Sequence, residues 1–137
     1  MSVTTRAASG SDLPFVEAVD VHLSPGSLAD LVSAGRVMVV EVDGNVVGLL
    51  RWGLFWDRVP FMNLLWVLPD RRGHGFGTSL VQAWERVQLA AGHDLVLTST
   101  VSAERSQHLY RRLGYVDSGA LLLPGEPAEL ILRKVLR

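Results

Sequence analysis

A glycine-rich segment between a strand and a helix constrains this chain more than any other feature. It runs from Arg72 to Thr78 with the sequence RGHGFGT and is called the glycine loop below. The run from Phe61 to Val67 before it is predicted to be a strand, and the apolar residues from Leu80 to Ala91 are spaced for one face of a helix. Glycines let backbone N–H groups approach a ligand, and a helix N-terminus carries partial positive charge. The glycine loop therefore predicts an anion cradle suited to phosphate.

Patterns along the rest of the chain predict further strands and helices. Runs of β-branched residues and turn residues such as Asp43-Gly44-Asn45 indicate strands and a hairpin. Strands are expected at 3–8, 37–42, 46–56, 61–67, 95–100, 115–123 and 130–136, and helices from Leu13, at 28–33, from the glycine loop to 91, and at 103–113. This order predicts an α/β fold of the mixed α+β kind: a mainly antiparallel, mixed sheet of about six to seven strands flanked by about four helices.

Composition limits the classes of function. A length of 137 residues predicts a single domain over 1–137. Cysteine is absent, which excludes disulfides, thiolate metal sites and cysteine nucleophiles. The formal net charge of −1 disfavours nucleic acid and anionic lipid as partners, since both attract a basic excess. Because no apolar run could span a bilayer and residues 1–12 lack a secretory signal, we expect a cytoplasmic protein without a membrane segment.

The glycine loop does not match either of two familiar phosphate-binding motifs. A P-loop ends in Lys followed by Ser or Thr, whereas this segment ends in Gly77-Thr78-Ser79 without a lysine. A dinucleotide-binding fingerprint has a third glycine where Thr78 stands and an acidic residue at the end of the next strand, and here Asp94 precedes that strand. The loop must therefore belong to another design.

Two motifs together fit a third design. Arg72, Gly75 and Gly77 occupy the defining positions of [Q/R]-x-x-G-x-[G/A], after a strand that ends in Val67-Leu68-Pro69. Residues 109–115, with the sequence LYRRLGY, match L-Y-x-x-x-G-[F/Y], with one predicted strand between the two motifs. In these motifs and in the order of its elements, the chain resembles the GNAT acetyltransferase superfamily over essentially its whole length.

The resemblance implies a GNAT-like acyl-CoA acyltransferase fold and an acetyl-CoA-dependent N-acetyltransferase. It implies that acetyl-CoA is the cosubstrate and that acetyl passes directly to a primary amine of a small molecule, a protein or a peptide. The backbone of Trp66, Val67 and Leu68 would hold the pantetheine arm and polarise the thioester carbonyl. The pyrophosphate would bind the loop formed by Arg72, Gly73, His74, Gly75, Phe76, Gly77 and Thr78.

One departure from the family keeps a second interpretation open. The family often has an asparagine seven residues before the motif tyrosine, where this chain has Ala103, and one polar contact to coenzyme A is thereby lost. A non-catalytic acyl-CoA-binding domain of the same fold is therefore the alternative to an enzyme.

Acetyl transfer to an amine needs an acid for the departing thiolate and a route for the amine's proton. The family match makes Tyr110 the candidate acid, since a phenol of pKa about 10 suits a thiolate of similar basicity. Helical spacing alone would make Tyr110 a core aromatic. Glu41, within a hydrophobic strand, is the candidate base, because burial would raise the pKa of its carboxyl. A solvated glutamate, with proton loss through water, is the alternative.

The remaining candidates concern metals, the acceptor and partners. The four histidines have no ligand spacing, so no metal site is expected. Residues 23–31, together with Trp52 and Trp56, are the candidate acceptor wall, because alternation places both rings and Leu54 on one face of a strand. Buried core is the default explanation for these rings. The motifs do not specify the acceptor, and homodimers are common among the proteins that the chain resembles.

Overall fold

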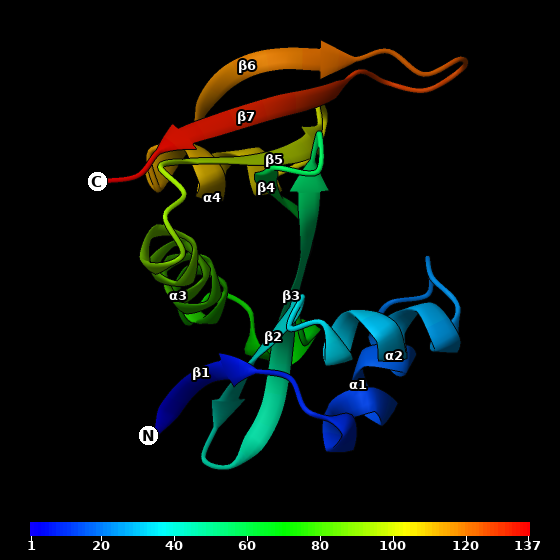
Figure 1. Cartoon of the computed structure of the whole chain (residues 1–137), viewed down its shortest axis with the longest axis vertical. Helices are drawn as coiled ribbons and strands as arrows, with labels where there is room; N and C mark the ends of the chain where they lie inside the picture. The colour runs from blue at the N-terminus through cyan, green and yellow to red at the C-terminus, as the bar shows by residue number, and fades with distance from the viewer. The chain divides into compact units, whose positions relative to one another are not determined.

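The computed structural model describes residues 1–137 and contains a mixed seven-stranded sheet and four α-helices (Figure 1). The strands are β1 (Val3–Ala7), β2 (Val37–Val42), β3 (Asn45–Phe55), β4 (Val59–Val67), β5 (Leu95–Val101), β6 (Val116–Leu121) and β7 (Glu129–Val135). The helices are α1 (Leu13–Val19), α2 (Pro25–Ser33), α3 (Phe76–Ala90) and α4 (Ser106–Arg112), with short 3₁₀ helices at Gly10–Asp12 and Pro69–Arg71. No helix is both long enough and apolar enough to cross a membrane.

The strand order of the sheet is β1-β2-β3-β4-β5-β7-β6. β1 with β2, β2 with β3, β5 with β7 and β6 with β7 are antiparallel pairs, whereas β4 and β5 are parallel. The parallel pair is joined through α3, because two parallel strands need a crossover connection. The predicted mixed, mainly antiparallel sheet with four helices is confirmed.

Contacts along the chain define two compact units. The first unit consists of Met1–Trp52 and Leu64–Trp84, and the second consists of Gly53–Asn63 and Glu85–Arg137. β3, β4 and α3 each contribute residues to both units. A single domain over 1–137 stays a prediction.

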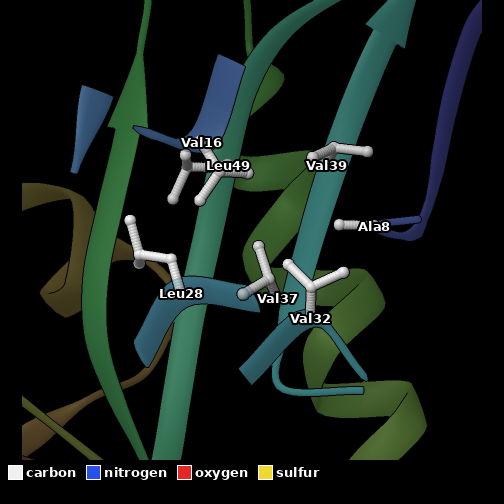
Figure 2. Close-up of a cluster of buried hydrophobic side chains, with 7 residues drawn as sticks. All are labelled: Ala8, Val16, Leu28, Val32, Val37, Val39 and Leu49. Carbon is white, nitrogen blue, oxygen red and sulfur yellow. The ribbon is translucent and has the colours of Figure 1, made fainter. Parts of the chain in front are cut away.

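The hydrophobic core of the first unit joins α1 and α2 to β2 and β3 (Figure 2). Leu28 and Val32 are four positions apart and share one face of α2, and alternate residues of β2, Val37 and Val39, share one face of the sheet. The buried cluster comprises Ala8, Val16, Leu28, Val32, Val37, Val39 and Leu49. This packing fixes both short helices on one face of the strands.

α2 begins earlier than the sequence predicts, at Pro25 and not at Leu28. The Ser24 side chain accepts a hydrogen bond from the Ser27 N–H at 3.2 Å, which is the contact of a helix N-cap. Proline is tolerated in the first turn because the N–H it lacks would have no partner there. The Pro-Gly-Ser sequence that looks like a break is therefore the start of the helix.

β3 ends one residue before the predicted boundary, at Phe55. Trp56 and Asp57 have φ angles of 55° and 57°, so both adopt the left-handed backbone of a tight hairpin turn. Trp56 is 72% exposed, and the prediction that it shares a strand face with Trp52 and Leu54 is wrong.

Gly48 of β3 lies close against the end of β4. A Cβ atom built on this glycine would lie 2.9 Å from the Trp66 carbonyl oxygen and 3.2 Å from methyl carbons of Val40 and Val67. No side chain larger than hydrogen fits there without movement of the neighbours. The end of β4 that leads into the glycine loop is thereby held against β3.

In the second unit, β7 lies between β5 and β6 (Figure 1). Val96 and Thr98 of β5 and Leu132 of β7 are buried, and the Thr98 hydroxyl donates to the Met62 carbonyl of β4 at 3.0 Å. All residues of β6, the edge strand, are exposed. α4 runs beside β5 and begins at Ser106, later than the predicted position 103.

Candidate functional site

The glycine loop follows the 3₁₀ helix after β4 and leads directly into α3, as predicted. Gly73 and Gly75 have φ angles of 81° and 83°, a left-handed conformation that strains any residue with a side chain. A Cβ atom at either glycine would meet nothing within 4 Å, so both backbones border open space. The two glycines therefore form an accessible, Cβ-free surface at the start of a helix.

Backbone donors gather at the N-terminus of α3. The first helical bond runs from the Ser79 N–H to the Gly75 carbonyl at 3.0 Å. The N–H groups of Phe76, Gly77 and Thr78 precede this bond and have no acceptor within the helix. α3 is 15 residues long, and its aligned peptide dipoles add partial positive charge at this end. The arrangement suits a phosphate group.

Arg72 and His74 of the glycine loop are both exposed. The Arg72 Nε donates to the Val67 carbonyl oxygen at 2.8 Å, and its guanidinium lies 5.7 Å from the ring centre of Trp66. The His74 ring lies against Phe76, with ring centres 5.9 Å apart. Arg72 therefore ties the start of the loop back to the end of β4, and it also brings positive charge to the loop.

The three backbone candidates on β4 have different hydrogen-bonding roles. The Leu68 N–H donates to the Val47 carbonyl of β3 at 2.8 Å, and the Trp66 carbonyl faces Gly48 of β3. Successive residues of a strand direct their N–H and C=O groups to alternate sides, so those of Val67 point away from β3. Among the three, the Val67 N–H is therefore the donor best placed to meet a ligand.

Tyr110, the predicted acid, lies on α4 in the second unit and is 5% exposed. Burial raises the pKa of its phenol to about 12, a nearby Glu104 charge acts in the same direction, and a hydrogen bond with Thr98 opposes them. Tyr110 is therefore buried, as its helical spacing predicts, and its phenol is protonated. It is a weaker acid than the value of about 10 assumed from the sequence.

Glu41, the predicted base, lies on β2 and is engaged in an ion pair. The Arg6 Nε donates to Glu41 Oε1 at 2.6 Å, and the two Arg6 Nη atoms donate to the two carboxylate oxygens of Asp12 at 2.7 and 3.0 Å. Arg6 thus neutralises two carboxylates at once. One oxygen of the Glu41 carboxylate, Oε1, is therefore engaged with Arg6.

The acceptor-wall candidates divide between the core and the surface. Leu28 is 1% exposed, and Leu23 and Leu31 pack against the same cluster. The Trp52 ring packs against Trp84, with ring centres 6.3 Å apart. The default explanation as core therefore holds for Leu23, Leu28, Leu31 and Trp52, whereas residues 24–27, Asp30 and Trp56 are exposed.

One group of functional interest was missed by the sequence. Glu85 of α3 accepts hydrogen bonds from the Tyr115 hydroxyl and from Lys134 of β7, both at 2.8 Å. In the motif L-Y-x-x-x-G-[F/Y], position 115 is specified only as Phe or Tyr, which gives no role to a hydroxyl group. Tyr115 and Lys134 lie 30 and 49 residues after Glu85 in the chain, so no local sequence pattern could have predicted these bonds.

Comparison with known families identifies the chain. The family described as "Acetyltransferase (GNAT) domain" matches residues 33–117, which include the glycine loop and the motif around Tyr110. This match covers more than half of the chain, so the chain belongs to the GNAT acetyltransferase family. No curated protein matches the chain significantly.

Solved structures of this family share the fold. A GNAT family acetyltransferase from Bacillus cereus has a TM-score of 0.82 and 21% identity, covering 100% of this chain and 99% of that one. The ribosomal-protein-S18-alanine N-acetyltransferase from Escherichia coli has a TM-score of 0.81 and 16% identity, covering 98% and 94%. The paia N-acetyltransferase from Thermoplasma acidophilum, in complex with coenzyme A, has a TM-score of 0.80 and 13% identity, covering 98% and 99%. At these identities the similarity concerns the fold, and the predicted GNAT fold is confirmed.

Proposed function

We propose that the chain is an acetyl-CoA-dependent N-acetyltransferase that passes acetyl directly to a primary amine of a small molecule, a protein or a peptide. The observation that carries the proposal is the pair of left-handed glycines, Gly73 and Gly75, at the start of α3 in a chain of the GNAT family. Two neighbours of the same fold support it: one acetylates an alanine of a ribosomal protein, and the other holds coenzyme A.

The glycine loop fits the pyrophosphate of acetyl-CoA. The backbone N–H groups of Phe76, Gly77 and Thr78 are free of helical partners, and no Cβ atom at Gly73 or Gly75 narrows the approach. When bound, acetyl-CoA supplies the acetyl group as a thioester. Val67, with its N–H directed away from β3, is the residue of β4 that we assign to the thioester carbonyl, in preference to Leu68.

Tyr110 is the proposed acid for the departing thiolate. With its pKa raised to about 12 by burial, the phenol stays protonated through the physiological range. It would donate its proton as the bond between carbonyl carbon and sulfur breaks. Because the chain has no cysteine, an acetyl-cysteine intermediate is impossible, and direct attack of the amine on the thioester is the proposed route.

The fate of the amine's proton separates two candidate functions. Glu41, one oxygen of which is bound to Arg6, is one route for this proton, and loss through water is the other. Glu41 is the only side chain proposed as the base. Its pairing with Arg6 favours a second candidate function, a non-catalytic acyl-CoA-binding domain of the same fold.

Two measurements test the proposal. Calorimetry measures acetyl-CoA binding, and release of free thiol is then followed with small aliphatic amines, aromatic amines and peptides with free N-termini. We expect binding and thiol release with at least one class of amine. Without acetyl-CoA binding both candidate functions are wrong, and binding without release across the panel supports the non-catalytic domain.

Variants of α4 test the acid. Tyr110→Phe should bind acetyl-CoA as the wild type does, and its turnover should fall by roughly ten-fold or more, the scale of a lost general acid. His108→Gln, an exposed change on the same helix, is the matched control and should retain turnover. Turnover of Tyr110→Phe near the wild-type value would remove Tyr110 from the mechanism.

A further inference from the structure

Tyr110 is held by Tyr115, the third residue after the end of α4. The Tyr115 N–H donates to the Tyr110 carbonyl at 3.0 Å and closes the end of α4. The two rings also pack against each other, with centres 5.9 Å apart and planes inclined by 59°. Tyr115 therefore restrains both the backbone and the ring of Tyr110.

Tyr115 is in turn fixed by a buried carboxylate. Its ring is 1% exposed, and its hydroxyl donates to Glu85 Oε2 at 2.8 Å. The other oxygen of Glu85 accepts from Lys134 Nζ at 2.8 Å, and this ammonium lies 5.7 Å from the centre of the Tyr115 ring. Both oxygens of Glu85 thus have partners. The two bonds connect α3 to Tyr115, just beyond α4, and to β7.

A buried carboxylate with two partners sets geometry more strongly than an apolar contact does. Hydrogen bonds that involve a charged group are short and directional, and burial without them would be costly. Burial and the Glu85 charge raise the pKa of Tyr115 well above its usual value, so its hydroxyl remains the donor in this bond. Tyr115 is therefore a fixed support for its neighbour and is unsuited to act as an acid itself.

We propose that Glu85 is a positioning residue for acetyl transfer, which acts through Tyr115 to hold the ring of Tyr110 in its working orientation. The proposal rests on the proposed function, in which Tyr110 is the acid. Small displacements of a catalytic group are expensive, and a shift of about 1 Å can lower a rate by about 100-fold.

A double-mutant cycle tests this role kinetically. Tyr115→Phe keeps the packed ring and removes only the bond to Glu85. We expect its kcat to fall about ten-fold while the KM for acetyl-CoA changes by less than about two-fold. In the Tyr110→Phe background the same change should have no further effect, because the group being positioned is gone. An equal loss in both backgrounds, or no loss in either, would overturn the proposal.

Two further variants sharpen the comparison. Glu85→Gln keeps the shape and one acceptor oxygen, and it should retain more kcat than Glu85→Ala. Arg86→Gln changes the exposed neighbour on α3 and should leave both kinetic constants unaltered. Equal losses for Gln and Ala at position 85 would mean that shape and hydrogen bonding at this site do not control Tyr110.

A spectroscopic readout does not depend on activity. Tyr110 and Tyr115 are the only tyrosines of the chain, so ring-¹³C-labelled protein gives two sets of NMR signals that single Phe variants assign. Glu85→Gln should shift the ring signals of Tyr110 and speed its ring flips, although residue 85 does not touch it. Unchanged Tyr110 signals would refute positioning by Glu85 even if no acceptor is found. If the Tyr110 signals shift but the wild-type protein transfers acetyl to no amine, the proposed function is wrong, whereas the structural link from Glu85 to Tyr110 stands.

Discussion

Replacing Gly75 by alanine separates the folding role of the glycine loop from its binding role. Gly75 has a φ of 83°, and a Cβ atom there would meet nothing within 4 Å. The folding penalty is therefore confined to the backbone, about 1 to 2 kcal/mol for an alanine held in the left-handed region. For a chain of this size, that predicts a melting temperature lower by roughly 4 °C for each kcal/mol.

The effect on binding should be larger than the effect on stability. The added methyl group would stand on the open surface from which the phosphate is expected to approach, next to the N–H groups of Phe76 and Gly77. We expect the Kd for acetyl-CoA to rise at least ten-fold, which corresponds to about 1.4 kcal/mol. Calorimetric titration with acetyl-CoA, at a temperature where both proteins are folded, measures this change.

Gly35 provides a matched control because it has the same geometry far from the loop in sequence. Its φ is 74°, and a Cβ atom there would also meet nothing within 4 Å. Gly35→Ala should lose a similar amount of stability and none of the affinity for acetyl-CoA. If Gly75→Ala binds as tightly as Gly35→Ala does, the loop is not the phosphate site and the reasoning fails.

Three further predictions concern stability. Arg51→Met leaves the fully buried Asp20 carboxylate without its ion-pair partner and should lower the free energy of unfolding by about 3 to 5 kcal/mol. Urea denaturation measures this, and a loss below about 1 kcal/mol would contradict it. Gly48→Ala forces a Cβ to within 2.9 Å of a backbone oxygen of β4 and should cost roughly 1 to 3 kcal/mol, seen as a lower melting temperature. The Arg6 guanidinium holds the pKa of the Asp12 carboxyl below its usual value, so the stabilisation by Asp12 is complete at neutral pH and is lost as the pH falls through the lowered pKa. The difference in unfolding free energy between wild type and Asp12→Asn should accordingly shrink below about pH 4, and a constant difference would show that ionisation of this carboxyl plays no part.

The order of elements could be predicted because turn residues and periodicity are local signals. Asp43 and Gly44 have φ angles of 51° and 83°, so the hairpin expected from this dipeptide forms where the sequence places it. The turn at Trp56 and Asp57 has the same left-handed backbone but contains no glycine, and its position was missed for that reason. Local propensity gives no warning when a large aromatic residue is forced into such a conformation by its surroundings.

The candidate site was predictable only where it is contiguous in sequence. The glycine loop is a continuous segment, and its conformation follows from its own glycines. The Arg6 ion pair with Glu41 joins residues 35 positions apart, and nothing near Glu41 indicates that its carboxylate already has a partner. The bond between Glu85 and Tyr115 could not be predicted for the same reason, since the two residues are 30 positions apart.

The position of β7 between β5 and β6 affects how the chain can fold during its synthesis. β6 leaves the ribosome before β7, yet β7 is its only neighbour in the sheet. Until residues 129–135 have paired with it, β6 is a strand without a partner, and its last residue Leu121 and the following Leu122 and Leu123 remain exposed even in the finished fold. Such an unpaired, apolar edge invites pairing with other chains. Folding chains in which β7 has not yet paired with β6 should therefore be the ones that most need a chaperone.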